Sequence, residues 1–248
     1  MSDTPKPAAV LAPKDSRILS GSALKVLAIV SMLVDHVTKR ILVAYPQFTR
    51  PLFALGETKV SWAVLFESFG RIAFPIFCFL LVEGFVYTHD RVRYGISLGC
   101  FALISEVLFD LARKLTPFDP TYQNVFFTLL IGYVGLCAYE HLRDQQGLRV
   151  IAVLSLALVS MGMLCDYGPR GYAMILMLYV LRDHALAKTA LGSCITTATW
   201  RAGLAFIPIN LYNGTRGFIR GPVLKYAFYA FYPLHLLVLW QLRLWLGV

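Results

Sequence analysis

The segment from Ser22 to Tyr45 reads SALKVLAIVSMLVDHVTKRILVAY, an apolar run with an acid and an imidazole side by side near its far end. It is long enough to cross a bilayer, which takes about 20 apolar residues. Placing Asp35 and His36 inside such a segment is costly, so residues of this kind usually face a bundle interior or a water-filled cavity. We therefore expect this pair to mark the centre of a functional site.

The composition of the chain narrows the class of protein. Of its 248 residues, 58% are hydrophobic and only 15% are charged, whereas soluble domains are about one quarter charged. The net charge of +9 is carried by Lys and Arg in short groups between apolar runs, which is typical of membrane flanks. We expect a polytopic membrane protein whose partner is the lipid bilayer, with no nucleic-acid partner.

Apolar segments of spanning length recur along the chain, and the alternation that a membrane β-barrel needs is absent. The sequence predicts an all-α membrane helical bundle of about eight transmembrane helices, a single domain over 21–248, in the inner (cytoplasmic) membrane. A polar tail over 1–20 is predicted to be disordered and cytoplasmic, and segment 60–68 either lies on the membrane surface or begins the second span. Lys and Arg are divided almost equally between the two sides of this scheme, so they do not fix its orientation. The predicted spans are 23–43, 69–88, 93–113, 122–140, 148–165, 171–182, 189–209 and 224–246.

In this eight-span scheme, the polar residues of separate segments gather in one half of the bundle. Glu106 and Asp110, for example, are four residues apart and so share one face of a helix. Such a gathering is the pattern of a polar cavity, where a membrane protein would carry out chemistry. The residues placed in this half are Asp35, His36, Arg71, Glu106, Asp110, Asn124, Thr128, Asp166, Tyr167, Arg170, Asn213, Arg216 and Arg220.

Each polar group also has a structural interpretation. The adjacent acid and imidazole could form an interhelical hydrogen bond, although imidazole titrates near neutral pH and so suits proton transfer. Arg71 could form a buried ion pair with Glu106 or Asp110, or bind an anionic group of a substrate. His235 could hydrogen-bond across the kink that Pro233 introduces. The acids, histidines and isolated cysteines show no metal-ligand spacing, so no metal is predicted.

Several sequence blocks, in order from Leu24 to about Leu237, resemble the TraX family. The first-named member of that family is a conjugation-plasmid protein associated with N-terminal acetylation of pilin. The family is also similar to larger membrane acyltransferases, of the acyltransferase-3 type, that take acyl groups from coenzyme A. The blocks are Leu24-Lys25-x-Leu27-Ala28 with Met32-x-x-Asp35-His36, Gly70-Arg71-Ile72-Ala73-Phe74-Pro75-Ile76-Phe77, Ala102-Leu103-Ile104-Ser105-Glu106 with Phe109-Asp110, Gln123-Asn124-Val125-Phe126-Phe127-Thr128-Leu129, Asp166-Tyr167-Gly168, Asn213-Gly214-x-Arg216-Gly217, and Lys225-Tyr226-x-Phe228-Tyr229-x-Phe231-Tyr232-Pro233-x-His235-Leu236.

The resemblance implies an integral membrane acetyltransferase that uses acetyl-CoA as co-substrate, without a metal. The acceptor would be an amine, such as the N-terminus of a pilin or another peptide, or a hydroxyl group of a small molecule. Nothing in the sequence itself points to pilin. Such a transfer needs a base for the acceptor's proton, donors for the developing oxyanion, and positive charge for the phosphates of coenzyme A.

The same resemblance implies roles for individual residues. His36 would be the general base, with Asp35 tuning or orienting it, and Asn124 would be an oxyanion donor. Glu106 and Asp110 would orient Arg71 or bind an acceptor amine. The residues expected to bind acetyl-CoA are Arg71, Arg170, Arg216, Arg220, Lys225 and His235.

Two other classes of function remain open from the sequence. A proton-coupled or anion transporter would also place acids, histidine and arginine inside a bundle. Transporters commonly contain internal repeats, and the Asp-His and Gly-Arg blocks have no counterpart after residue 124. A non-catalytic assembly factor for a pilus or a conjugation system would tolerate substitution of these polar residues.

Overall fold

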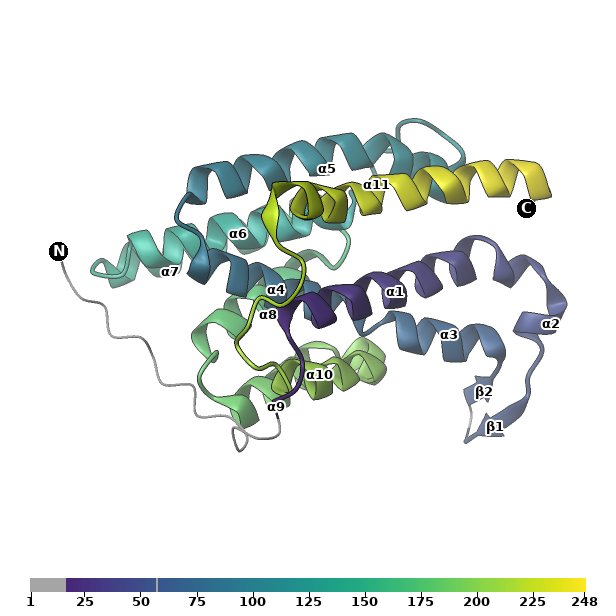
Figure 1. The fold of residues 1–248 in the computed structure, drawn as a ribbon, viewed down its shortest axis with the longest axis horizontal. Helices are drawn as coiled ribbons and strands as arrows, with labels where there is room; N and C mark the ends of the chain where they lie inside the picture. Colours follow the sequence, from purple (N-terminus) through teal and green to yellow (C-terminus); the bar gives the residue numbers. More distant parts are fainter. Residues whose placement is uncertain (1–16, 57) are drawn as a thin grey trace.

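The computed structural model describes residues 17–56 and 58–248, so the predicted disordered tail lies almost entirely outside the described residues. Helices make up nearly all of the regular structure, which confirms the all-α class. Figure 1 shows α4 in the middle of the bundle, with α5 and α11 side by side along one edge. The first half contains α1 (Gly21–Arg40), η2 (Leu42–Ala44), α2 (Pro46–Thr49), β1 (Phe53–Leu55), β2 (Thr58–Val60), α3 (Trp62–Gly70), α4 (Ala73–Tyr87) and α5 (Arg91–Lys114). The second half contains α6 (Val125–His141), α7 (Gln146–Gly162), α8 (Gly168–Val180), α9 (Ala185–Ile195), η3 (Thr197–Ala205), α10 (Phe206–Asn210) and α11 (Gly221–Leu246).

Side-chain caps begin several of the helices. The hydroxyl of Ser20 accepts a hydrogen bond from the backbone N–H of Ala23 at the start of α1, and the carboxylate of Asp90 accepts one from the N–H of Arg93 at the start of α5. Such caps satisfy N–H groups that have no partner inside the helix. The segment between α2 and α3 forms a small antiparallel hairpin in which Phe53 pairs with Val60.

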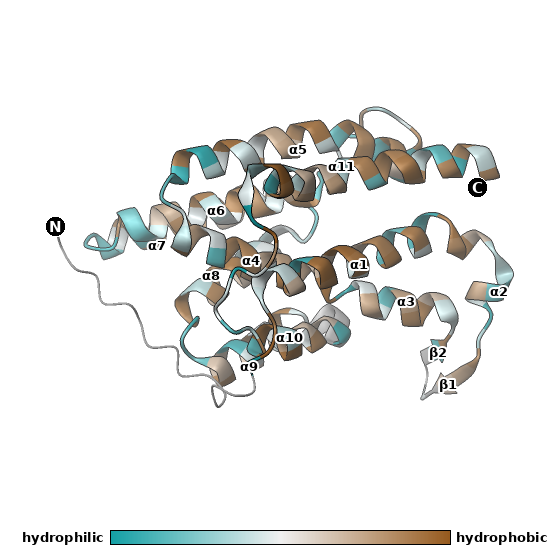
Figure 2. Ribbon diagram, viewed as in Figure 1, coloured by the Kyte–Doolittle hydropathy of each residue, from teal (hydrophilic) through white to brown (hydrophobic). Residues whose placement is uncertain are grey.

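In the described part of the chain, three helical stretches are long and apolar enough to cross a membrane. They are Trp62–Tyr87, which joins α3 and α4, Arg91–Lys114 and Gly221–Leu246. Helices α6, α7 and α9 are apolar but shorter. The predicted number of eight spans is therefore not confirmed. Apolar helices and a membrane location are supported. Figure 2 shows the apolar residues along the helices and the polar ones mainly at their ends.

The predicted span 189–209 is wrong, because the chain is broken there into α9, η3 and α10. Gly192 explains the fold-back: a Cβ at this position would lie 1.8 Å from the ring of Phe206, so only glycine lets α10 pack against α9. The chain then returns to the start of α1. There the N–H of Gly21 donates to the carbonyl of Thr215 (2.8 Å) and that of Ser22 to Arg216 (2.9 Å).

Helices α1 and α11 consequently begin at the same end of the bundle. The loop that precedes α11 runs beside the start of α1, whereas α2 and the hairpin lie at the opposite end of α1 (Figure 1). Residues 213–225 therefore lie at the other end of α1 from His36. The prediction that Arg216 and Arg220 share one half of the bundle with His36 is wrong, since it counted 189–209 as a crossing.

Candidate functional site

Two histidines from helices far apart in the sequence are paired where α1 meets α11. Nδ1 of His36, on α1, lies 2.7 Å from Nε2 of His235, on α11. The two ring planes are only 13° apart and the ring centroids 5.0 Å apart, so the rings lie edge to edge, nearly in one plane. Nδ1 of His235 lies 3.0 Å from the carbonyl oxygen of Phe231. His235 was predicted to bind acetyl-CoA, but its direct partners in the structure are His36 and the backbone of its own helix.

Asp35 does not contact its neighbour His36. Its carboxylate forms an ion pair with Lys39, one helical turn along α1, at 2.6 Å. Adjacent residues of a helix point about 100° apart, which explains the separation of the acid from the imidazole. Asp35 therefore does not orient His36 by direct contact, and the predicted tuning of the imidazole would act through another group. The other carboxylate oxygen, Oδ1, is buried and has no hydrogen-bond partner among the described residues.

A close approach of two helices places Gly70 and Arg71 beside Asp35. The hydroxyl of Ser31 donates to the carbonyl oxygens of Phe69 (2.7 Å) and Gly70 (3.2 Å). A Cβ on Gly70 would lie 2.3 Å from the Cβ of Asp35, so this crossing requires glycine. Arg71 follows at the end of α3. The packing of α3 against α1 thus explains the glycine of the Gly70-Arg71 motif.

Arg71 forms no ion pair or side-chain hydrogen bond in the described residues, so the predicted pairing with Glu106 or Asp110 is wrong. Its charge acts instead on Asp166, in the connection between α7 and α8. The hydroxyl of Tyr122 donates to Asp166 (2.7 Å).

Burial raises the pKa of Asp166, and the charge of Asp35 raises it further. The hydrogen bond from Tyr122 and the charges of Lys39 and Arg71 lower it. Burial and the charge of Asp166 likewise raise the pKa of Tyr122. Asp166 therefore belongs to the same polar cluster as Asp35, Lys39, Arg71 and Tyr122. The Asp166-Tyr167-Gly168 block was the sequence signal for it, but no role followed from the sequence.

Asn124 is fully engaged in holding the start of α6. Its side-chain oxygen accepts from the N–H of Phe126 (2.9 Å), and its amide nitrogen donates to the carbonyl of Ala102 (2.8 Å) and to Glu106. Its own N–H also donates to Glu106 (3.0 Å). No donor of Asn124 is left for an oxyanion, so the structure assigns it a capping role.

Asp110 accepts a hydrogen bond from the N–H of Asp119 (2.7 Å) and so ties α5 to the loop that follows it. Asp119 in turn is paired with Arg113 and with Lys114, the latter at 2.6 Å. Glu106 and Asp110 thus lie on one face of α5, as predicted, but their hydrogen-bond partners are backbone groups and Asn124 rather than Arg71. One oxygen of each is buried without a partner in the described residues.

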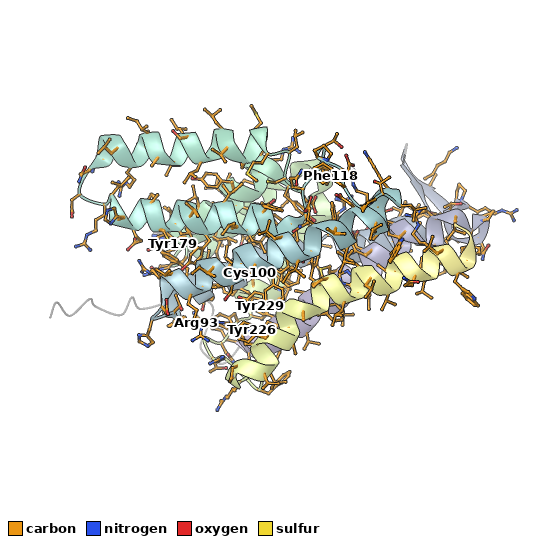
Figure 3. All side chains as sticks on the ribbon, turned by 90° about the horizontal axis from the view of Figure 1, so that it is seen from above. Arg93, Cys100, Phe118, Tyr179, Tyr226 and Tyr229 are labelled. Atoms are coloured by element: carbon orange, nitrogen blue, oxygen red, sulfur yellow. The ribbon has the colours of Figure 1, made fainter. Side chains whose placement is uncertain are left out.

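A cavity of about 670 Å³ opens between the first halves of α1 and α11, the second half of α4, and parts of α5 and α6. Aromatic and aliphatic side chains together line most of it. In Figure 3, Tyr226 and Tyr229 at the start of α11 lie beside Arg93 and Cys100 of α5, and Tyr229 lines the cavity. Tyr232 and Met32 line its deep part, and the ring of Tyr232 meets that of His36 edge-on at 6.2 Å.

Three cations line the outer end of this cavity: Lys25, Arg216 and Lys225. None of them is in an ion pair in the described part of the chain. The structure thus brings two of the predicted donor-binding residues together and adds Lys25, which the sequence reasoning did not assign. Arg170 and Arg220 are exposed and lie outside the cavity lining.

Comparison with known proteins gives two matches. A model of the family described as TraX protein matches residues 20–243. The probable fimbrial assembly protein FimC, serogroup H1, of Dichelobacter nodosus is 25% identical over 255 residues, which cover 92% of this chain and 97% of that protein. No solved structure matches the chain.

Proposed function

Because this chain belongs to the TraX family, we propose that it is a membrane acetyltransferase that takes its acetyl group from acetyl-CoA. The acceptor is an amine, such as the N-terminus of a pilin or another peptide, or a hydroxyl group. The protein works in the inner membrane, where it meets acetyl-CoA from the cytoplasm.

The observation that carries this proposal is the layout of the cavity. Its outer end has three cations, Lys25, Arg216 and Lys225, that form no ion pair with any described residue and suit a polyanionic group such as the phosphates of coenzyme A. Its aromatic walls suit an extended, weakly polar arm. About three helical turns separate Lys25 from His36, a rise of roughly 16 Å along α1. A donor held by its phosphates would thus extend its thioester toward the histidine pair.

The chemistry follows from this placement. His36 takes a proton from the acceptor amine or hydroxyl as that group attacks the carbonyl carbon of the thioester. The C–S bond then breaks, and the sulfur leaves with the proton returned by His36. The products are the acetylated acceptor and free coenzyme A. Tyr232 lines the cavity and contacts His36, which does not line it, so the thioester has to pass the ring of Tyr232 to react.

The polar cluster supplies a site for the acceptor. Asp35 and Asp166 carry side-chain oxygens that can accept hydrogen bonds from an acceptor amine or hydroxyl, and Arg71 forms no ion pair within the described residues. These groups lie on α1, at the end of α3 and in the connection before α8, and none of them lines the cavity. Donor and acceptor would thus approach His36 from different directions.

A second candidate function is pilus assembly without catalysis, which the name of the FimC relative favours. An assembly factor would bind its partner through surfaces that do not depend on the histidine pair or on the cations of the cavity. The two candidates therefore differ in the effect of substituting these residues.

The test uses the full chain in lipid nanodiscs, with acetyl-CoA binding measured by calorimetry and release of free coenzyme A measured with a thiol reagent. Lys225→Gln should weaken binding roughly tenfold, the loss expected for one charge-assisted contact. His36→Ala should keep binding and slow thioester cleavage by about 100-fold or more. Arg143→Gln is the matched control, because Arg143 is exposed, with a side chain 68% accessible, and lies outside the cavity. Absence of binding and of cleavage in folded wild-type protein would exclude the enzyme and favour assembly.

A further inference from the structure

The contacts of His235 determine where its protons lie. Nδ1 of His235 is 3.0 Å from the carbonyl oxygen of Phe231. A carbonyl oxygen can only accept a hydrogen bond, so Nδ1 of His235 must carry the hydrogen. In a neutral imidazole the other nitrogen is then a bare acceptor, which makes Nε2 of His235 an acceptor.

This acceptor determines the state of His36. Its Nδ1 lies 2.7 Å from Nε2 of His235, so Nδ1 of His36 must be the donor. Nε2 of His36 is then left with a free lone pair. We propose that His235 is a positioning residue that holds His36 in its Nδ1–H form, with Nε2 as the base; this proposal rests on the acetyltransferase function proposed above.

The packing around His235 keeps this arrangement rigid. The rings of Phe231 and His235 stack with planes 13° from parallel and centroids 5.2 Å apart. The ring of His36 lies edge to edge with that of His235, nearly in the same plane, and Tyr232 meets His235 edge-on at 5.4 Å. His235 is only 6% exposed, so water does not compete for its nitrogens. The imidazole of His235 is thus packed against the rings of Phe231 and Tyr232 and is fixed by a hydrogen bond at each nitrogen.

The arrangement also stabilises the charged form of His36 during the reaction. When Nε2 of His36 takes the acceptor's proton, the resulting imidazolium donates from Nδ1 to His235, a charge-assisted hydrogen bond that is stronger than the neutral one. His235 gains no proton in this step, and its Nδ1–H continues to donate a hydrogen bond to the carbonyl oxygen of Phe231. The proton on Nε2 of His36 then passes to the departing sulfur. Asp35 does not supply this orientation, since its partner is Lys39.

Two nearly isosteric substitutions of His235 distinguish the role of its Nε2 from the role of its Nδ1. Glutamine places its side-chain oxygen near the position of Nε2 and can still accept from His36. Asparagine places its amide near the position of Nδ1, so it keeps the bond to Phe231 but loses the acceptor. Both variants remove the imidazole and leave similar space, so a role in packing alone would affect them equally.

The proposal is tested by turnover and by NMR of protein labelled with ¹⁵N-histidine. His235→Gln should keep turnover within about threefold of the wild type, whereas His235→Asn should reduce kcat at least about tenfold with KM for acetyl-CoA unchanged, because a base in the wrong tautomer is inactive. The ¹⁵N spectrum should show His36 protonated at Nδ1 in the wild type and in His235→Gln, and as a mixture of tautomers in His235→Asn. His141→Asn is the control, since His141 is exposed at the end of α6.

The two readouts separate this proposal from the proposed function. Equal turnover in the Gln and Asn variants, or a wild-type His36 protonated at Nε2, would overturn the positioning role even if the protein cleaves acetyl-CoA. If the tautomers behave as expected but no variant or wild-type protein cleaves the thioester, the hydrogen-bond chain stands and the acetyltransferase function is rejected.

Discussion

Asn124 shows how a polar residue in a family motif can serve structure instead of chemistry. It is fully buried, caps α6 through Phe126, and connects that helix to Ala102 and Glu106 of α5. We expect Asn124→Ala to lower the free energy of unfolding by about 2 kcal/mol or more, because it removes a cap and leaves Glu106 with fewer donors in a buried place. Thermal unfolding in detergent checks this expectation.

Asn213→Ala is the control for this substitution. Asn213 also accepts hydrogen bonds, from the N–H and hydroxyl of Thr215, but in an exposed turn. Its loss should change stability by less than about 0.5 kcal/mol. If instead Asn124→Ala unfolds like the wild type while cleavage of acetyl-CoA is lost, Asn124 acts on the oxyanion, as the sequence suggested, and the capping role is not its main one.

At the level of helices, the crossing of α1 and α3 depends on the absence of a side chain at Gly70. A Cβ there would lie 2.3 Å from the Cβ of Asp35 and 2.8 Å from its Oδ1. We expect Gly70→Ala to push α3 away from α1 and to destabilise the protein by about 1 to 3 kcal/mol, the usual cost of overpacking. Because Arg71 follows directly, binding of the acceptor should weaken as well. Thermal unfolding and turnover in the same preparation measure the two effects.

Gly147 provides the matched control, since it lies in α7 and a Cβ there meets nothing within 4 Å. Gly147→Ala should leave stability unchanged or raise it slightly, because alanine favours the helix. A Gly70→Ala protein as stable as the Gly147→Ala protein would show that α1 and α3 are not held at this distance.

The helices themselves could be predicted from the sequence because apolar runs of this length have few other solutions in a membrane. The break between α9 and α10 could not, because it depends on Phe206 packing onto Gly192, a contact that composition does not reveal. One miscounted crossing then moved Arg216 to the wrong end of the bundle. The partner of His36 could not be predicted either, because it also depends on tertiary packing. His235 lies 199 positions away and meets His36 only because α1 and α11 run in the same direction.

On the scale of the whole molecule, the eight-span scheme and the structure differ in a way that can be measured. The scheme places the connections around residues 49 and 215 on the same side of the membrane, because an even number of crossings separates them. In the structure, the carbonyl oxygen of Thr215 accepts a hydrogen bond from the N–H of Gly21 at the start of α1. Thr49 lies in α2, beyond the other end of α1. Both threonines are exposed. A cysteine at each position should therefore react with a membrane-impermeant maleimide from opposite sides.

The experiment uses a cysteine-free background, because Cys100 and Cys194 are themselves exposed. Thr49→Cys and Thr215→Cys are labelled separately in intact and in permeabilised spheroplasts. One of them should react in both preparations and the other only after permeabilisation. The position near Thr215 should be the one protected in the intact preparation, because the proposed function requires Lys25, Arg216 and Lys225 to face the cytoplasm, where acetyl-CoA would reach them. Labelling of both cysteines from the same side would show that segment 189–209 crosses the membrane after all. Labelling of Thr215→Cys from outside would place the cationic end of the cavity out of reach of the proposed donor.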